Sequence, residues 1–398
     1  MSQTPPPPLS KHARMKALLL LVAAGLVASI ATNGSRMAVP LFAVHLSASP
    51  MTVGLILSAY AIIPAFVAIA IGRWMDRIGA RLPMQIASAG LALALLVPWL
   101  FPELWALAVS AAMVGVFMVF IYVGSQQVAG ALGDASSRTQ IFTVLTVAQS
   151  IALLVSPPVT GLLIDHMGHR SAFLALSIVA MGLTAMMTFG GKLLPAHARR
   201  HATAKNNLVE LLRMPAVLGA LIVASLGPVG WDMLFFFVPL HGAHLGLSAS
   251  AIGLVFSCFS VSIIAIRLAV PWMAKRVNEW HMIAIALGTA AVIFLFYPLT
   301  GSAGSMMVLA VMLGAGMGIS QPVILSIMYA SSPPGRQAEV LGMRSTALNA
   351  VQIVSPLMLG AMTAGMGLAA AMWPFAVLLS GGTYFCVKRG RQRATSAD

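Results

Sequence analysis

A succession of long apolar stretches, separated by short turns, constrains this chain more than any other feature of its sequence. About 20 consecutive apolar residues are what an α-helix needs to cross the hydrocarbon core of a bilayer. The stretches predict about twelve transmembrane helices, at residues 17–43, 51–72, 82–100, 104–130, 139–163, 170–191, 214–240, 250–273, 280–298, 304–329, 338–362 and 368–387. The expected fold class is therefore an all-α membrane protein.

The scarcity of charge favours the same class. Charged residues make up 8% of the chain and its mean hydropathy is +0.94, whereas a soluble domain carries about a quarter charged residues. So few charges would not cover the surface of a soluble protein of 398 residues. We expect residues 1–16 to be a disordered, basic N-terminal segment. The apolar stretch after it is too long for a signal peptide and is expected to be a retained transmembrane helix.

The distribution of lysine and arginine predicts the orientation of the chain. The formal net charge of +14 is by itself compatible with nucleic-acid binding. If the N-terminus lies in the cytoplasm, 19 of the 23 Lys and Arg residues fall on the cytoplasmic side and one on the other side. Cytoplasmic loops of membrane proteins carry this excess. We therefore expect a multi-pass protein of the bacterial inner membrane, embedded in the lipid bilayer, with both termini cytoplasmic and no nucleic-acid partner.

The chain also matches itself, without gaps, when it is shifted by 199 residues. The matches include Pro40 with Pro239, His45 with His244, Gly54 with Gly253, Gly115 with Gly314, Pro157 with Pro356 and Gly161 with Gly360. Each half has six predicted helices, and an even number returns the chain to the cytoplasm. We expect two pseudo-symmetric six-helix bundles, 17–191 and 214–387, joined by a cytoplasmic linker at 192–213. A basic cytoplasmic tail follows at 388–398.

The loop between the second and third predicted helices, Gly72-Arg73-Trp74-Met75-Asp76-Arg77-Ile78-Gly79-Ala80-Arg81, carries a motif. It resembles the loop motif of the major facilitator superfamily, in which Gly is followed four residues later by Asp, then by a basic residue, Gly and a basic pair. The matching residues are Gly72, Asp76, Arg77, Gly79 and Arg81, and Ala80 departs from the basic pair. With the repeat, the resemblance covers roughly residues 15–390. It implies the major facilitator fold and a bacterial transporter of twelve helices.

Two other features of the family are incomplete. Members that exchange drugs for protons carry an Arg shortly before a Gly in the fourth helix, and residues 111–115 contain no Arg. The antiporter motif of the fifth helix is reduced to Ser-Pro-Pro-Val-Thr-Gly at 156–161. The resemblance therefore leaves proton symport, facilitated passage and proton-driven export open.

In the implied fold, the loop motif acts as a lock between the two halves. Asp76 is expected to face the cytoplasmic start of the eleventh helix, where the helix dipole favours a carboxylate. Arg344 is expected to extend its side chain towards the same point, and Gly72 and Gly79 to permit a tight turn and a close approach of backbones. The alternative is that the basic residues of the loop only hold it in the cytoplasm.

Four charged residues fall inside predicted helices: Arg36, Asp232, Arg267 and Arg344. A charge at the centre of a membrane helix costs roughly 2.5–3.5 kcal/mol, which makes each a candidate functional residue. Arg267 and Arg344 lie near cytoplasmic ends, where a structural role is as reasonable as a functional one. Arg36 and Asp232 lie deeper, and we expect them to approach each other when the outer side closes and to gate the cavity. A permanent pair, or an Arg36 side chain that extends to the outer surface, is the alternative.

The resemblance also implies that helices one, four, seven and ten line a central cavity. Asn33 is equivalent to Asp232 under the repeat, so both halves place a polar group at the same depth. Gln126 and Gln321 are expected to face the cavity and contact the substrate. A second group of amides is expected to join helices by hydrogen bonds instead: Gln149, Asn349 and Gln352.

The chain has no Gly-x-Ser-x-Gly, Walker or zinc-protease motif, and none of its predicted helices carries paired catalytic groups. Histidines near helix ends, such as His241 and His244, lack the set of donors that a metal needs. We therefore predict that the protein is not an enzyme and has no catalytic residue, metal or cofactor.

The predicted function is secondary active transport of a small molecule across the cytoplasmic membrane by alternating access, coupled to protons, in a monomer. The charges within helices are three positive and one negative, which suits a small organic anion. Two alternatives stay open. One is a proton-driven efflux pump for drugs or metabolites, and the other is a membrane sensor or partner protein that kept the fold without transport.

Overall fold

The computed structural model describes residues 11–132, 138–194, 208–332 and 337–395. These residues form helices and no strand, which confirms the all-α fold class. The helices are α1 (Lys11–His45), α2 (Pro50–Ile78), α3 (Arg81–Leu100), α4 (Leu104–Leu132), α5 (Arg138–Gly190), α6 (Leu208–Arg213), α7 (Pro215–His244), α8 (Ala249–Met273), α9 (Glu279–Phe296), α10 (Ala303–Ser331), α11 (Gln337–Met366) and α12 (Met372–Thr395), with single 3-10 turns at Gly191–Leu193 and Tyr297–Leu299.

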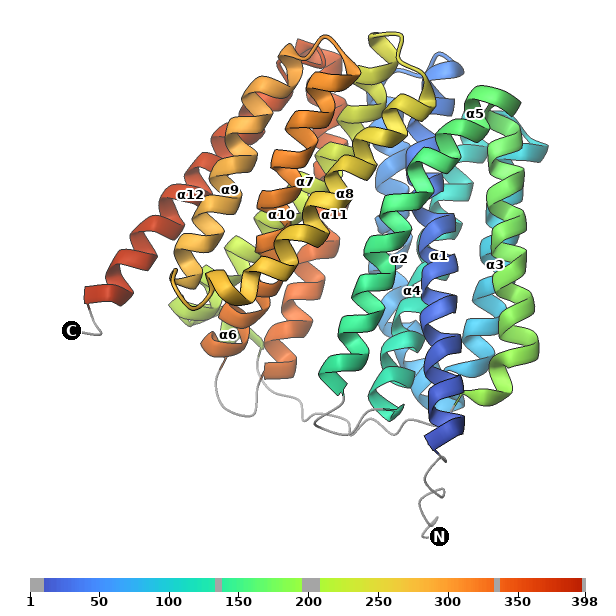
Figure 1. Cartoon of the computed structure of the whole chain (residues 1–398), viewed down its shortest axis with the longest axis horizontal. Helices are drawn as coiled ribbons and strands as arrows, with labels where there is room; N and C mark the ends of the chain where they lie inside the picture. The colour runs from blue at the N-terminus through green and yellow to red at the C-terminus, as the bar shows by residue number, and fades with distance from the viewer. Residues whose placement is uncertain (1–10, 133–137, 195–207, 333–336, 396–398) are drawn as a thin grey trace.

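Ten helical stretches of the described chain are long and apolar enough to cross a membrane. One of them, Val144–Leu193, contains two predicted spans, because Gly168 has a φ of 81° and interrupts the helical conformation of α5. The chain reverses direction at this point within α5, next to its label in Figure 1. α12 falls outside the ten, since Lys388 and Arg389 shorten its apolar stretch. All twelve predicted spans are nevertheless helical and occur in the predicted order.

The ends of several helices differ from the prediction. α1 already begins at Lys11 and α12 continues to Thr395, so parts of the expected N-terminal segment and tail are helical. Helical hydrogen bonding does not stop where an apolar stretch ends, and Lys and Arg are good helix formers. Part of the expected linker is helical too, as α6, whereas residues 195–207 lie outside the described residues.

The two halves begin their second helices in the same way. Ser49 Oγ accepts a hydrogen bond from the Thr52 N–H at 3.2 Å at the start of α2. Its repeat partner Ser248 accepts one from the Ala251 N–H at 3.2 Å at the start of α8. Such caps satisfy backbone donors that a helix leaves unpaired at its N-terminus. The repeat therefore sets the first residue of both helices.

Two bundles lie side by side in the molecule, one containing α1–α5 and the other α7–α12 (Figure 1). Both ends of the described chain lie on the same face, which we call the terminal face, and the other end of the bundles is the opposite face. The bundles converge towards the opposite face and diverge towards the terminal face in this view. The expected pair of pseudo-symmetric bundles is confirmed.

The sequence repeat appears in the structure as two equivalent contacts between the bundles. α2 packs on α11, and α5 packs on α8. At Gly253 of α8, an added Cβ would lie only 2.6 Å from the Pro157 carbonyl oxygen of α5, and at Gly54 of α2 it would overlap the Pro356 carbonyl oxygen of α11. Small residues let membrane helices approach backbone to backbone. The shared glycines and prolines of the repeat therefore hold the bundles together at the opposite face.

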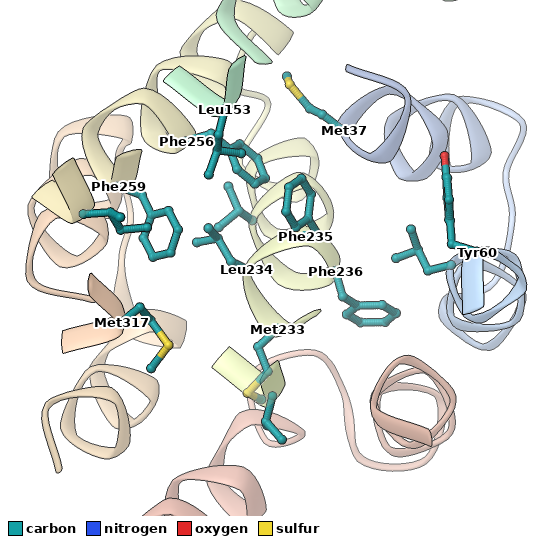
Figure 2. Packing of buried hydrophobic residues seen from close by; sticks show 14 of the residues in the cluster. Met37, Tyr60, Leu153, Met233, Leu234, Phe235, Phe236, Phe256, Phe259 and Met317 are labelled. Atoms are coloured by element: carbon teal, nitrogen blue, oxygen red, sulfur yellow. The ribbon is translucent and has the colours of Figure 1, made fainter. Parts of the chain in front are cut away.

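The second half of α7 contains a segment that is enclosed on all sides. Residues 233–238 are consecutive and all buried, and Figure 2 shows Met233, Leu234, Phe235 and Phe236 pointing away from the helix in different directions. A helix that is apolar all round lies in the interior of a bundle. Asp232 directly precedes this run and is itself buried, so an acidic residue lies at the edge of this enclosed segment.

Candidate functional site

A cavity of about 440 Å³ lies between the two bundles. Its volume falls within the range of small-molecule sites, about 300–1,000 Å³. Residues from α1, α2, α4 and α5 line it on one side, and residues from α7, α8, α10 and α11 on the other. The four helices expected from the sequence contribute, and the other four join them because they are the helices that pack between the bundles.

Five amide side chains line the cavity: Asn33, Gln149, Gln321, Asn349 and Gln352. Asn33 and Gln321 were expected there. The other three were expected to join helices, and they face the cavity because α5 and α11 border the space between the bundles. Gln126 is exposed and lies outside the lining. It is one helical turn beyond Tyr122, on the terminal side of the cavity.

Three aromatic residues of the lining escaped prediction: Tyr60, Tyr122 and Trp231. The Tyr60 hydroxyl lies 2.8 Å from Ser35 Oγ, and the Trp231 ring meets the Phe259 ring edge to face at 5.1 Å. In a sequence this apolar, an aromatic residue does not stand out. The one available signal was that Trp231 is adjacent to the only acid found deep within a predicted helix.

The structure brings Arg36 and Asp232 together across the two bundles. Nη2 of Arg36 in α1 lies 3.4 Å from Oδ1 of Asp232 in α7. The Arg36 side chain is 23% exposed and lines the cavity, whereas the Asp232 side chain is 1% exposed and lies behind it. The Arg36–Asp232 pair therefore forms the end of the cavity that lies towards the opposite face, which we call the inner end.

A serine hydroxyl and two aromatic rings surround this pair. Ser355 Oγ donates a hydrogen bond to Asp232 Oδ2 at 2.5 Å. The Arg36 guanidinium lies 5.0 Å from the centre of the Phe235 ring and 5.6 Å from that of Tyr60, and its Nε has no hydrogen-bond partner among the described residues. Charge-assisted hydrogen bonds normally measure about 2.7–2.9 Å. The single contact of 3.4 Å is therefore longer than a normal charge-assisted hydrogen bond.

The two bundles differ at Asp232 in the group that accepts the hydrogen bond of a repeated serine. Ser156, the repeat partner of Ser355, donates its hydroxyl to the Ile30 carbonyl oxygen of α1 at 2.5 Å. The contact of α1 with α5 thus corresponds to the contact of α7 with α11. The serine is kept in both bundles, but the second bundle offers it a carboxylate where the first has Asn33.

Arg267 is the second cationic residue of the lining. Its Nη1 donates to Ser150 Oγ of α5 at 3.0 Å, and its Nη2 donates to Gln321 Oε1 of α10 at 2.8 Å. Arg267 therefore spans the two bundles. The sequence left its role open between structure and function, and the structure places its guanidinium in the cavity.

A carboxylate joins the bundles at the opposite face. Asp165, in the turn region of α5, accepts hydrogen bonds from the N–H groups of Ala249 at 2.8 Å and Ser250 at 2.9 Å. These groups form the N-terminus of α8, where the helix dipole favours a negative charge. The repeat-related positions are Ala364, which has no carboxylate, and Pro50, which has no N–H. The contact between α5 and α8 alone therefore carries this cap, which sequence reasoning missed.

The loop motif is only partly placed. Gly79 has a φ of 84° and ends α2, and its N–H bonds to the Met75 carbonyl oxygen at 2.8 Å. Gly72 lies inside α2, and an added Cβ would meet nothing within 4 Å. No other helix therefore approaches Gly72 closely within the described part of the chain, and its expected role in a close approach of backbones stays a prediction.

The charged residues of the proposed lock do not form a described contact. Arg77 is exposed and Arg81 is half-buried. The Asp76 side chain lies outside the described residues. Arg344 is half-buried in α11, and its Nε has no hydrogen-bond partner within the described part of the chain. The lock between the halves stays a prediction.

No group of three or more His, Cys, Asp or Glu residues that could hold a metal ion occurs among the described residues. His241 instead lies with its Nε2 2.9 Å from the Thr300 carbonyl oxygen. His45 and His169 contact each other with ring centres 4.8 Å apart.

Solved structures with the same arrangement of helices are transporters. A POT family transporter in complex with a thioalcohol-conjugated peptide superposes with a TM-score of 0.81 and 12% identity, covering 94% of this chain and 96% of that one. A bacterial homologue of the human lysosomal transporter Spinster, inward-facing and unoccupied, gives 0.76 and 13%, covering 96% and 98%. A nucleoside transporter gives 0.77 and 12%, covering 94% and 99%. These likenesses show the fold.

The sequence of the chain is similar to that of a known protein and matches the profile of a protein family. The tetracycline resistance protein, class D, of Salmonella ordonez is 24% identical over 317 residues, which cover 77% of this chain and 78% of that protein. The Major Facilitator Superfamily profile matches residues 21–356. The chain therefore belongs to the Major Facilitator Superfamily and is a multi-pass membrane transporter.

Proposed function

We propose that this transporter is a monomeric, proton-coupled exporter of a small organic molecule that works by alternating access in the bacterial inner membrane. The observation that carries the proposal is the Arg36–Asp232 pair, which joins the two bundles at the inner end of the cavity. An ion pair between bundles that must separate is suited to couple a proton to movement. The cavity supplies the place for a substrate.

The orientation follows from the basic residues. Arg73, Arg77, Lys275 and Arg276 are exposed at the ends of α2 and α8 on the terminal face. The positive-inside rule assigns such a face to the cytoplasm. In this orientation the cavity lies on the cytoplasmic side of the Arg36–Asp232 pair. The present conformation is then the one that receives substrate from the cytoplasm.

Release to the other side requires the contacts at the opposite face to open. These contacts are the Arg36–Asp232 pair, the Asp165 cap on α8 and the glycine contacts of α2 with α11 and α5 with α8. Parallel six-helix repeats typically rock against each other around a central site. The pseudo-symmetric contacts lie on the side that closes and opens in such a motion, and both must separate for release.

Asp232 is the proposed proton site. When the bundles separate at the opposite face, Asp232 loses Arg36 while it stays among apolar side chains. An unpaired charge in the membrane interior is costly, so separation favours uptake of a proton from the outer side. Return of Arg36 then favours release of that proton on the cytoplasmic side. One proton moves inward for each outward step.

Export is favoured over import by the relative whose name records tetracycline resistance. An efflux pump for drugs or metabolites is thus the direction of transport that we adopt. The reduced motifs in the fourth and fifth helices do not oppose it, because Asp232 supplies a separate acidic group for coupling.

The test uses purified protein in liposomes that hold a pH indicator. Tetracycline and a panel of small organic acids are added under an imposed pH gradient. We expect at least one compound to accelerate proton movement through the wild-type protein. Asp232→Asn should abolish this acceleration while it retains exchange of labelled substrate across the membrane. Full proton-coupled transport by Asp232→Asn, or transport indifferent to the gradient, would contradict the proposal.

A further inference from the structure

The geometry points to an anionic substrate whose carboxylate, or other planar oxyanion, binds to Arg267. Arg267 would then be the residue that selects this class of substrate. The inference rests on the proposed function, because it names the substrate class of the same cavity. The two arginines of the lining then have different roles: Arg36 belongs to the gate and Arg267 binds the substrate.

The charges of the cavity do not cancel. Arg36 is paired with Asp232. Within the described part of the chain, the hydrogen-bond partners of Arg267 are the neutral Ser150 hydroxyl and the Gln321 amide. Among the described residues, no carboxylate lies within ion-pair distance of Arg267, and none lines the cavity. One positive charge is therefore left for a ligand to neutralise.

The two neutral partners hold the guanidinium in a fixed orientation. Ser150 accepts from Nη1 and Gln321 accepts from Nη2, so the plane of the group is set from both bundles. A guanidinium has five N–H donors, and these contacts use two of them. The remaining donors match the two oxygens of a carboxylate, which Arg binds in a bidentate manner. A lysine at this position would supply the charge without that fork.

The position of Arg267 argues against a purely structural role. It lies six residues before the end of α8 at Met273, within reach of the terminal face. Long basic side chains near helix ends normally extend to the membrane surface. Arg267 instead turns into the space between the bundles and contacts α5 and α10. A charge held there is expected to serve a ligand.

The rest of the lining fits the uncharged part of such a molecule. Gln149, Asn349 and Gln352 offer amide groups, and Tyr60 and Trp231 offer aromatic side chains. The cavity volume of about 440 Å³ admits a single small molecule. The substrate class is therefore a small organic acid with polar and aromatic or apolar parts.

The test measures binding without any proton gradient. Purified protein is titrated in detergent with matched pairs of small aromatic and aliphatic carboxylic acids and their carboxamides. We expect wild-type protein to be stabilised against heat by acids and to bind them at least about tenfold more tightly than the amides. Arg267→Gln should remove this preference, and Arg267→Lys should keep part of it. Arg276→Gln, which changes an exposed arginine stacked on Trp272, should leave it unchanged.

Two results would overturn the inference. One is a wild-type protein that binds the acids no better than the amides, including the case in which neither binds. The other is an unchanged preference in folded Arg267→Gln and Arg267→Lys proteins. Both leave the proposed function standing, because proton coupling is measured separately through Asp232→Asn. Conversely, an uncoupled protein that still prefers acids through Arg267 would refute the coupling and support the anion site.

Discussion

Gly161→Ala is expected to force the protein out of its present conformation. Gly161 of α5 faces the start of α8, and an added Cβ would lie 2.6 Å from the Ala249 carbonyl carbon and 2.7 Å from the Ser250 Cα. These are backbone atoms and cannot turn aside. Ordinary contact begins at 3.4 Å, so relief of the contact with the carbonyl carbon requires a separation of roughly 0.8 Å, the difference between 3.4 and 2.6 Å. The added Cβ would also overlap the Ala249 carbonyl oxygen, which requires a larger separation.

The size of the effect follows from this overlap. Overpacking of a close contact typically costs about 1–3 kcal/mol. The same contact is absent when the bundles separate at the opposite face, so the cost falls on the present conformation alone. The equilibrium should therefore shift towards the outward-open state by about 5- to 150-fold. Gly182→Ala is the matched control, because Gly182 lies in the second span of α5, after Gly168, and an added Cβ there meets none of the described residues within 4 Å.

The assay is cysteine labelling in intact cells. Cys258 and Cys386 are first replaced by serine, and the cavity residue Ser29 is changed to cysteine. A maleimide that does not cross the membrane should then label Gly161→Ala faster than the wild type by a factor within that range. Gain of helix propensity is common to both alanine variants, so it cancels. Equal labelling of Gly161→Ala and Gly182→Ala would refute the reasoning.

Three further predictions concern charged groups and orientation. Asp165→Asn should lose the negative charge and one of the two hydrogen bonds to α8, a cost of about 1 kcal/mol to the present conformation. Labelling of the cysteine at position 29 from outside the cell should therefore rise about fivefold, whereas Glu103→Gln, which changes an exposed acid, should not raise it. Equal effects of the two variants would count against the cap. Neutralising Arg36 or Asp232 alone should impair transport, and Arg36→Asp combined with Asp232→Arg should restore part of it; additive losses without rescue would argue against pairing. Cysteines introduced into the linker at 192–213 should react only with reagents that reach the cytoplasm, and labelling from outside would reverse the assigned orientation.

The fold was predictable because membrane proteins carry strong, long-range signals in sequence. Apolar stretches of fixed length predicted the helices, and the shift of 199 residues predicted two equivalent halves. The equivalent contacts at Gly54 and Gly253 were found only in the structure. The ends of α1 and α12 were less predictable. Hydropathy reports where lipid surrounds a helix, whereas hydrogen bonding and helix propensity decide where the helix ends.

The candidate site was predictable where a residue conflicts with its surroundings. Arg36 and Asp232 stood out because a charge in an apolar helix needs a partner, and the structure brings them together at 3.4 Å. The direction of Arg267 and Gln149 could not be predicted. It depends on how α5 and α8 are rotated about their axes where they pack between the bundles, which no local pattern records. The Asp165 cap was hidden because its partners are backbone N–H groups.

One measurement tests the central claim that the protonation state of Asp232 moves the bundles. Spin labels at Phe101 and Gly301 report the separation of the bundles at the opposite face, and labels at Arg77 and Arg276 report it at the terminal face. All four positions are exposed. Distance distributions are compared between wild-type protein and Asp232→Asn, which mimics the protonated carboxyl group. The account predicts a longer distance at the opposite face and a shorter one at the terminal face in the variant. Two unchanged distances, or two that change in the same direction, would contradict it.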